Sequence, residues 1–321
     1  MEIHPKDFCI FVASHISKQK RINLLLQCLH SLIKQNMVIC IYVSISFDNK
    51  TLMDECIHKV SQDECINKCA FLNILVRENK CSQMQHIHLL YQETNKNHKW
   101  IMFCDDDDEY LESRTFKIGE QILLYQDQIK NTVLELAGIY ESTFGKDHRQ
   151  HGHEYWCYCI HKDLLLDFFH HLKNNDEIVK HACCDVLFSE YLRRKGNQWL
   201  FGRLKEKQYL YRNNNNDESI THFITSQQAK YTNTSIPPSK NSDEWKVYVK
   251  EFNNFINENL DIFLHDLFVL CITNMDFDTY LKREFLANYE ILDYVDQEHI
   301  QKLKENHKKW TTIFQSMYEI K

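Results

Sequence analysis

The chain has few glycines and prolines, the two residues that tight turns use most. Its 321 residues include only 6 glycines and 3 prolines. An all-β sandwich or barrel needs turn residues at frequent intervals, so the shortage argues against that class and favours helices joined by polar loops. The expected class is α/β or α.

The chain also lacks an excess of positive charge. Its formal net charge is -7 at pH 7, and its sequence pI is near 6.2. Proteins that follow a phosphate backbone carry a basic surface, so no nucleic-acid partner is expected.

Long apolar runs are absent as well. No uninterrupted apolar stretch approaches the roughly 20 residues that a membrane-spanning helix needs. The N-terminal segment lacks the basic and apolar regions of a secretory signal. We therefore expect no transmembrane segment.

Paired cysteine motifs are missing, although cysteine itself is common. The 13 cysteines are odd in number and form no Cys-x-x-Cys pair. Several lie inside apolar segments such as 8–10 and 39–41, where a free cysteine behaves as a small buried hydrophobic residue. The pattern favours a soluble protein of a reducing compartment, the cytoplasm, over a disulfide scaffold.

Short apolar runs alternate with segments of helical periodicity in the first hundred residues. The expected strands are 8–13, 38–45, 71–76 and 100–104. The expected helices between them are 21–35, 51–60 and 84–93. Strands that alternate with helices at this spacing imply right-handed crossovers and a mostly parallel sheet with helices on both faces.

The rest of the chain divides at polar linkers. Further strands are expected at 132–139 and 155–160, and further helices at 162–171 and 184–195. The best linkers are the asparagine run 213–216 and the proline-containing segment 232–242. We expect an α/β domain over 1–228 and a helical domain over 229–321, and the helices of the second domain could pair with a second copy of the chain.

Polar residues follow the expected strands at their carboxyl ends. In chain order they are Ala13-Ser14, Asp48, Arg77 and the run 105–108. Ligands of a mostly parallel sheet bind at the carboxyl ends of its strands. The sequence therefore predicts that these residues meet in one crevice.

The run Asp105-Asp106-Asp107-Asp108 is the clearest chemical signal. Neighbouring carboxylates raise one another's pKa and repel, so either a cation or full solvation must compensate them. The apolar segment 100–104 indicates the end of a buried strand, which favours a cation. Carboxylates suit Mg²⁺ or Mn²⁺, which commonly bridge to a diphosphate. The competing interpretation is a solvated loop or a charge cluster at a helix N-terminus.

Segment 100–110, Trp-Ile-Met-Phe-Cys-Asp-Asp-Asp-Asp-Glu-Tyr, resembles the strand and DxD motif of GT-A glycosyltransferases, especially the large inverting family 2. Segments similar to that family's first helix, third-strand turn and two closing motifs are 28–35, 77–80, 209–212 and 219–222. The resemblance covers about residues 7–225. It implies a Rossmann-like GT-A fold and the transfer of a sugar from a UDP-sugar, or a related nucleotide-sugar, to a glycan or protein acceptor.

The resemblance also implies roles within the acidic run. Asp105 and Asp106 would face the nucleotide, and Asp107 and Asp108 would hold Mn²⁺ or Mg²⁺ together with His222. The register is open by one residue because all four positions are aspartate. An ordinary exposed histidine is the alternative for His222.

Further donor contacts are implied at the other strand ends. The residues concerned are Ala13, Ser14, Asp48, Arg77, Lys80 and Arg212. Asp48 matches the position at which the family accepts a hydrogen bond from the uracil imide. Simpler roles remain open, because Asp48 could cap the next helix and Arg212 could pair with a surface acid.

Asp185 is the expected catalytic base. Inverting sugar transfer needs a group that removes the proton of the acceptor hydroxyl, and the resemblance places it at the start of a late helix, usually as Glu-Asp. Here Cys184-Asp185 occupies that place, so the preceding acid is lost. A helix N-cap is the competing role for Asp185.

The segment before the strand at 155–160 is assigned to the acceptor side. Its residues are His153, Glu154, Tyr155 and Trp156, and aromatic faces there could stack on a sugar ring. The segment is equally consistent with a polar loop that ends in a core aromatic pair.

Two other function classes stay open. A nucleotidyltransferase would use the same fold and two metals and release pyrophosphate, but no glycine-rich phosphate loop follows the first strand. A non-catalytic interaction protein would keep a vestigial acidic site and use its helical domain, and the missing acid at Cys184 supports that class.

Overall fold

The computed structural model describes residues 4–94, 97–141, 154–181, 184–194, 199–212, 238–258 and 296–318, together with Asp276, Phe277 and Thr279. The chain divides into two compact units, residues 1–212 and 213–321, which are described separately. The domain boundary expected at 228 falls in a stretch outside the described residues, so it stays a prediction.

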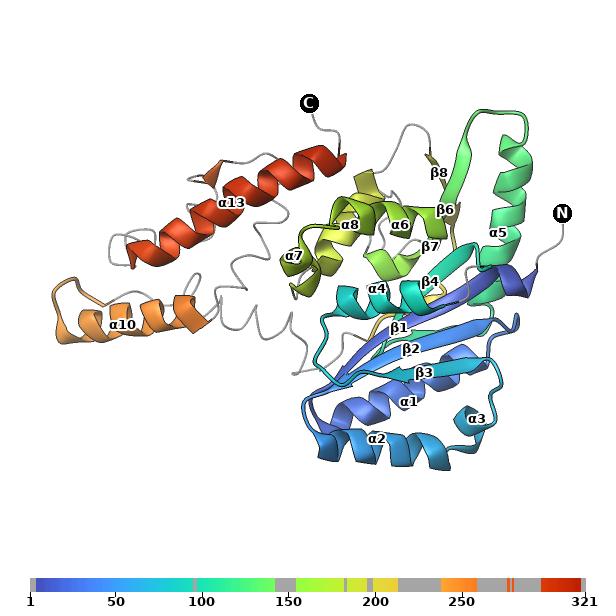
Figure 1. The fold of residues 1–321 in the computed structure, drawn as a ribbon, viewed down its shortest axis with the longest axis horizontal. Helices are drawn as coiled ribbons and strands as arrows, with labels where there is room; N and C mark the ends of the chain where they lie inside the picture. The colour runs from blue at the N-terminus through green and yellow to red at the C-terminus, as the bar shows by residue number, and fades with distance from the viewer. Residues whose placement is uncertain are drawn as a thin grey trace. The chain divides into compact units, whose positions relative to one another are not determined.

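A seven-stranded mixed sheet forms the centre of the first unit (Figure 1). In spatial order its strands are β3 (Leu72–Val76), β2 (Cys40–Phe47), β1 (Phe8–Ile16), β4 (Trp100–Asp105), β7 (Tyr158–His161), β6 (Glu135–Glu141) and β8 (Trp199–Leu204). Strands β1 to β4 pair in parallel, and β7 is antiparallel to both of its neighbours. The expected α/β architecture, a mostly parallel mixed sheet flanked by helices, is confirmed.

Helices cover both faces of the sheet. In Figure 1, α1 (Gln19–Ile33) and α2 (Lys50–Gln62) lie on one face, and α4 (Gln83–Glu93) lies on the other. This follows from right-handed crossovers, because the chain moves from β1 to β3 in one direction and returns to β4 in the opposite one. The apolar stripe of α1, which includes Leu25 and Leu29, is fully buried against the sheet.

Further helices and a small sheet complete the first unit. The helices are α3 (Glu64–Asn67), α5 (Arg114–Ile129), α6 (Lys162–His171), α7 (Asp176–Lys180) and α8 (Cys184–Arg194). Short antiparallel strands β5 (Glu109–Tyr110) and β9 (Tyr209–Leu210) pair just after the acidic run. They bring the segment before Arg212 next to Asp108.

Six elements were not predicted from the sequence, namely the helices α3, α5 and α7 and the strands β5, β8 and β9, and one further strand differs from its prediction. Helix α5 buries the polar residues Arg114 and Thr115 and exposes the apolar residues Phe116 and Leu124, so its sequence lacks a clear apolar stripe. The strand expected over 155–160 begins with a 3₁₀ turn, η2 (Tyr155–Cys157), and becomes extended only at Tyr158.

The described part of the second unit is helical, as its apolar periodicity predicts. Helix α10 (Asp243–Glu258) buries Trp245 and Phe252, and α13 (Gln297–Tyr318) buries Leu303, Trp310 and Phe314. Within the described residues, none of the helices combines the length and the apolar character that crossing a membrane requires.

Candidate active site

The carboxyl ends of β1 and β4 meet where the strand order of the sheet reverses. The chain runs from β1 outward to β2 and β3 and then places β4 on the other side of β1. The parallel pairing of β1 with β4 ends at Ala13 and Asp105. In open α/β sheets, ligands bind outside the strand ends at such a switch point. The acidic run begins at this point.

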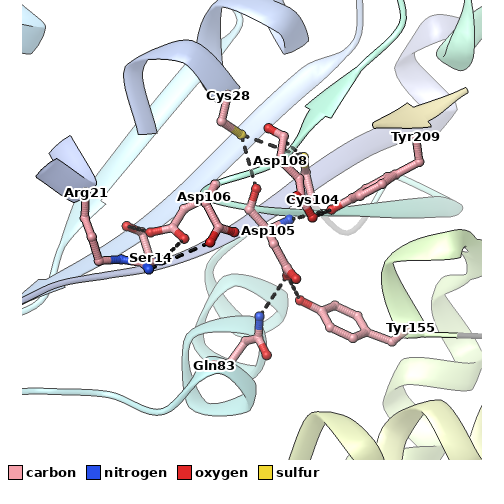
Figure 2. A network of polar contacts seen from close by, with 11 residues as sticks. Ser14, Arg21, Cys28, Gln83, Cys104, Asp105, Asp106, Asp108, Tyr155 and Tyr209 are labelled. Atoms are coloured by element: carbon pink, nitrogen blue, oxygen red, sulfur yellow. Dashed lines mark hydrogen bonds and ion pairs between the residues drawn. The ribbon is translucent and has the colours of Figure 1, made fainter. Parts of the chain in front are cut away.

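Ser14 and Asp106 bridge the switch point (Figure 2). The Ser14 hydroxyl donates to Asp106 Oδ2 at 2.6 Å, and both side chains are buried. Arg21, in the first turn of α1, donates to Asp106 Oδ1, and its other terminal nitrogen lies 3.8 Å from Asp107 Oδ2. Arg21 is therefore an internal counter-ion for two of the four aspartates.

Asp105 is held by side chains from three other elements. Its Oδ1 accepts from Gln83 Nε2 at 2.8 Å and from the Tyr155 hydroxyl. Its backbone N–H donates to the Tyr209 hydroxyl at 3.0 Å. The end of β4 is thus tied to α4, η2 and β9.

Asp108 has hydrogen-bond partners at both carboxylate oxygens. Its Oδ2 accepts from the Tyr209 hydroxyl at 2.8 Å, and its Oδ1 accepts from the backbone N–H of Arg212 at 2.8 Å. The Arg212 side chain pairs with Glu109 and donates to Gln27 Oε1 at 2.6 Å. Asp108 therefore fastens the segment after β9 to the acidic run.

Tyr209 is anchored in turn by a buried ion pair. Arg114 Nε donates to Glu141 Oε2 at 2.9 Å, and both side chains are essentially inaccessible. The other Glu141 oxygen accepts from the Tyr209 backbone N–H at 2.7 Å, while Arg114 donates to the Trp156 carbonyl at 3.0 Å. The guanidinium also lies 4.0 Å from the ring centroid of Tyr110.

The acidic run carries more negative charge than Arg21 compensates. Burial, reinforced by Asp108 and Asp107, raises the pKa of Asp105 well above its usual range. Burial also raises the pKa of Asp106 to about 6, although Arg21 opposes the rise, and raises the pKa of Asp108 to about 7. Additional positive charge at this site would be stabilised.

Asp107 is the aspartate that suits a divalent cation best. Its side chain is 24% exposed, and carboxylate oxygens are the ligands that Mg²⁺ and Mn²⁺ prefer. Within the described ranges, no group of three or more His, Cys, Asp or Glu side chains could hold a metal ion by itself. A cation at Asp107 would need oxygens from a ligand such as a diphosphate. The predicted ligand His222 lies outside the described residues.

Asp48 and Lys80 lie together, as the sequence predicted for neighbouring strand ends. Asp48 Oδ1 accepts from His15 Nε2 at 2.9 Å and from Lys80 Nζ at 3.4 Å. Slight burial raises the pKa of Asp48, but His15 and Lys80 outweigh this effect and lower it. The capping role that was open for Asp48 belongs to Asn49, whose side chain accepts from Leu52 N at 3.0 Å.

Arg77 has partners inside the protein. Its two terminal nitrogens donate to the two carboxylate oxygens of Glu93 at 2.8 and 2.9 Å, and its Nε donates to Ser44 Oγ at 2.7 Å. The guanidinium predicted to contact the donor is therefore occupied by Glu93 and Ser44 in this structure.

Asp185 lies in the first turn of α8. Burial, then Asp105 and then Asp185 raise the pKa of the Tyr155 hydroxyl. The same hydroxyl bonds to Asp105, so Tyr155 interacts electrostatically with Asp185 and directly with the acidic run. The preceding residue, Cys184, is completely buried.

Tyr155 and Trp156 are core residues, which is the alternative that the sequence left open for them. Their exposed fractions are 2% and 4%. Trp156 stacks against Tyr209 and Tyr211, with ring centroids 4.2 and 5.3 Å apart. Their predicted contact with the acceptor, and that of half-buried Glu154, is not tested by the structure, and His153 lies outside the described residues.

Sequence reasoning missed Arg21, Gln83 and Tyr209 as site residues. A signal existed for Gln83, because Ser82 and Gln85 form a capping box that fixes the start of α4 beside the strand ends. Tyr209 belonged to a segment that resembled a family motif, but its bonds to Asp105 and Asp108 were not foreseen. Nothing in the spacing singled out Arg21.

Neither a protein-family model nor a curated protein matches the chain. Among solved structures, it is similar to S. aureus TarS 1-349 in complex with UDP, with 12% identity, a TM-score of 0.44, and coverage of 98% of this chain and 90% of that chain. It is also similar to the mannosyltransferase PcManGT from Pyrobaculum calidifontis in complex with GDP-Man and Mn2+, with 8% identity, a TM-score of 0.44, and coverage of 97% and 84%.

Proposed function

We propose that this protein is a glycosyltransferase that transfers a sugar from a UDP-sugar, or a related nucleotide-sugar, to a glycan or protein acceptor. The observation that carries the proposal is the position of the acidic run at the switch point of the sheet, bridged to β1 by the Ser14–Asp106 hydrogen bond. A diphosphate with its cation suits a site that has excess negative charge and a partly exposed carboxylate.

The donor would lie along the ends of β1, β2 and β4. Ala13 and Ser14 would contact the base and ribose, and the ionised Asp48 would accept a hydrogen bond from the base. Lys80 lies beside Asp48 with a 69% exposed side chain, so it is free to turn toward a phosphate. Asp105 and Asp106 would face the nucleotide from the other side of the switch point.

Asp107 would hold Mn²⁺ or Mg²⁺ together with the donor diphosphate. When bound, the cation supplies positive charge that stabilises the departing diphosphate. The protein adds Arg21, whose guanidinium already lies beside Asp106 and Asp107. Its position favours retention of the nucleoside diphosphate while the bond to the sugar breaks.

Asp185 would be the base of an inverting reaction. It would take the proton of the acceptor hydroxyl as the oxygen attacks the anomeric carbon of the sugar. Its electrostatic effect on Tyr155, whose hydroxyl bonds to Asp105, supports this role. Cys184 supplies no second carboxylate beside it, so Asp185 is the acid of this segment that would take the proton.

Calorimetry with UDP tests the donor site. Wild-type protein and Asp107→Asn are titrated with UDP, with and without Mn²⁺, and Asp54→Asn on the outer helix α2 is the matched control. We expect Mn²⁺ to strengthen UDP binding in the wild type and the control, and to have little effect in Asp107→Asn. A UDP affinity that changes neither with Mn²⁺ nor with the Asp107→Asn substitution would contradict the assignment.

Product analysis separates the remaining classes. Incubation with a panel of nucleotide-sugars should release nucleoside diphosphate, whereas pyrophosphate release from a nucleoside triphosphate would identify a nucleotidyltransferase. A folded protein that binds no nucleotide and turns over none would favour the interaction-protein class.

A further inference from the structure

Six polar side chains form a continuous hydrogen-bonded row between α4 and the strands β1 and β2. In order they are Arg77, Ser44, His86, Ser46, His15 and Asp48, and their successive contacts measure 2.7, 2.8, 3.0, 2.9 and 2.9 Å. We call this set the polar chain. Ser44, His86 and Ser46 are buried, whereas the side chains of His15 and Asp48 at one end are 21% and 41% exposed.

Both histidines of the polar chain are neutral near pH 7. Burial lowers the pKa of His86 to about 3 and also lowers the pKa of His15. A neutral imidazole has one N–H donor and one bare nitrogen that accepts. Each ring therefore donates one hydrogen bond and accepts another.

The ionised carboxylate of Asp48 fixes the direction of the first bonds. A carboxylate only accepts, so His15 carries its proton on Nε2, and its Nδ1 must accept from the Ser46 hydroxyl. Ser46 has then used its one proton. It can only accept from His86, which places the His86 proton on Nε2.

The other end of the polar chain demands the same direction. With its proton on Nε2, His86 accepts at Nδ1 from the Ser44 hydroxyl. Ser44 must then accept from Arg77 Nε, which is a donor and nothing else. Asp48 at one end of the polar chain and Arg77 at the other therefore require the same arrangement of protons. The bonds to Glu93 hold the Arg77 guanidinium in place.

The row Ser46, His15 and Asp48 has the composition of a nucleophilic triad but not its accessibility. Ser46 is 0% exposed, and its hydroxyl also lies within 3.4 Å of the Cys81 backbone N–H. No substrate carbonyl can reach it. The row serves to orient groups and does not perform acyl transfer.

We propose that the polar chain is a positioning device for the base-binding end of the donor site. It holds His15 in the Nε2–H tautomer and so keeps the Asp48 carboxylate aimed as a pure hydrogen-bond acceptor. The selectivity that follows is for bases that offer an N–H, such as the imide of uracil, over cytosine, which offers a bare nitrogen there. This inference rests on the proposed function for its ligand but not for its proton arrangement.

The proton arrangement is tested by NMR of the full chain labelled with ¹⁵N in the histidine rings. Signals are assigned by their loss in His86→Gln and His15→Gln. At pH 7.5 both rings should be Nε2–H tautomers, and Ser46→Ala should shift the His15 ring away from that pure form. An Nδ1–H tautomer or a protonated ring at either histidine in the wild type overturns the inference, whether or not any variant folds poorly.

The effect on the donor site is tested with UDP and CDP at fixed Mn²⁺. Ser46→Ala should weaken UDP binding about fivefold, the weight of one net hydrogen bond, and leave CDP binding unchanged or improved. His86→Gln, whose amide still donates to Ser46, should restore most of the UDP affinity that His86→Leu loses. The matched control is His88→Gln, also on α4, where His88 stacks on Phe169 outside the polar chain.

The two failures are distinguishable. If the wild type binds no nucleotide while the tautomers are as described, the proposed function fails and the proton arrangement stands. If UDP binds but Ser46→Ala leaves both the UDP-to-CDP ratio and the His15 ring unchanged, the donor site stands and the polar chain has no positioning role.

Discussion

The Tyr209 hydroxyl donates a hydrogen bond to Asp108 Oδ2 at 2.8 Å, although the two residues are 101 positions apart in the chain. The same hydroxyl accepts from the backbone N–H of Asp105 at 3.0 Å. One phenol therefore clamps the two ends of the acidic run, and the shape of that run depends on a residue that is not acidic.

Tyr209→Phe should loosen this clamp while keeping the ring in the core. Loss of the hydroxyl leaves a buried carboxylate oxygen and an N–H without their partner, which costs about 1–3 kcal/mol of folding stability. We expect UDP binding in the presence of Mn²⁺ to weaken severalfold in calorimetry. Tyr42→Phe is the control, because its hydroxyl bonds to His98 near the start of β2. Equal UDP affinities in both variants would refute the clamp.

The buried Arg114–Glu141 pair should be costly to break from one side. Glu141→Leu leaves the Arg114 charge uncompensated in the core and deprives the Tyr209 N–H of its acceptor. We expect a loss of about 3–5 kcal/mol in urea unfolding. Arg114→Met combined with Glu141→Leu should lose clearly less than the two single changes together, since no charge is stranded. Additive losses would show that the pair is not coupled.

Long-range side-chain pairs such as Arg114–Glu141 mark what could not be predicted from the sequence, whereas the order of the secondary-structure elements could. Apart from the short α3, the order of strands and helices up to β4 followed from the sequence pattern, because the strands are short apolar runs and the helices have apolar residues at helical spacing. The partners of the acidic run did not follow. Arg21 meets Asp106 across 85 positions, and spacing cannot choose it from the 38 lysines and arginines. Its selection depends on the register between β1 and β4, which is a tertiary property.

Arg77 is a second residue whose position was predictable from the sequence but whose partners were not. The sequence correctly put it at the end of β3, and the end of a strand in this fold suggested a donor contact. It could not reveal that Glu93, which lies 16 positions later at the end of α4, and Ser44 both bind the guanidinium. The polar rim was predictable, whereas the pairing within it was not.

His86 should make folding stability depend on pH. Its folded pKa of about 3 lies below the ordinary value of 6.5, so the unfolded chain takes up a proton first as the pH falls. Its contribution is complete above pH 6.5 and is lost progressively between 6.5 and 3. Urea unfolding of wild type should lose about 2 kcal/mol more than His86→Gln between pH 7 and pH 5. Parallel losses in the two proteins would contradict the burial of a neutral ring.

Arg21→Met should separate cation binding from diphosphate binding. Removing the guanidinium beside Asp106 and Asp107 makes the site more negative, so Mn²⁺ alone should bind several-fold more tightly in titration calorimetry. UDP binding at saturating Mn²⁺ should weaken, because one cation near the diphosphate is lost. Arg193→Met on α8 is the control, since that residue pairs with Glu190. A change of the same sign for both ligands would count against the counter-ion role.

Asp185→Asn should abolish transfer without disturbing the donor. The amide cannot accept the acceptor proton, and loss of a general base lowers the rate by roughly 10²- to 10⁴-fold. Because Asn keeps the size of Asp185 and the substitution leaves all four aspartates of the acidic run in place, UDP affinity with Mn²⁺ should stay within about twofold of wild type. Tyr155→Phe gives the reverse pattern: Asp105 loses its hydroxyl partner, so UDP affinity falls while the base is kept. Measured side by side, turnover and UDP binding thus distinguish the two positions. If Asp185→Asn keeps full turnover, the base lies elsewhere and Asp185 serves only the start of α8.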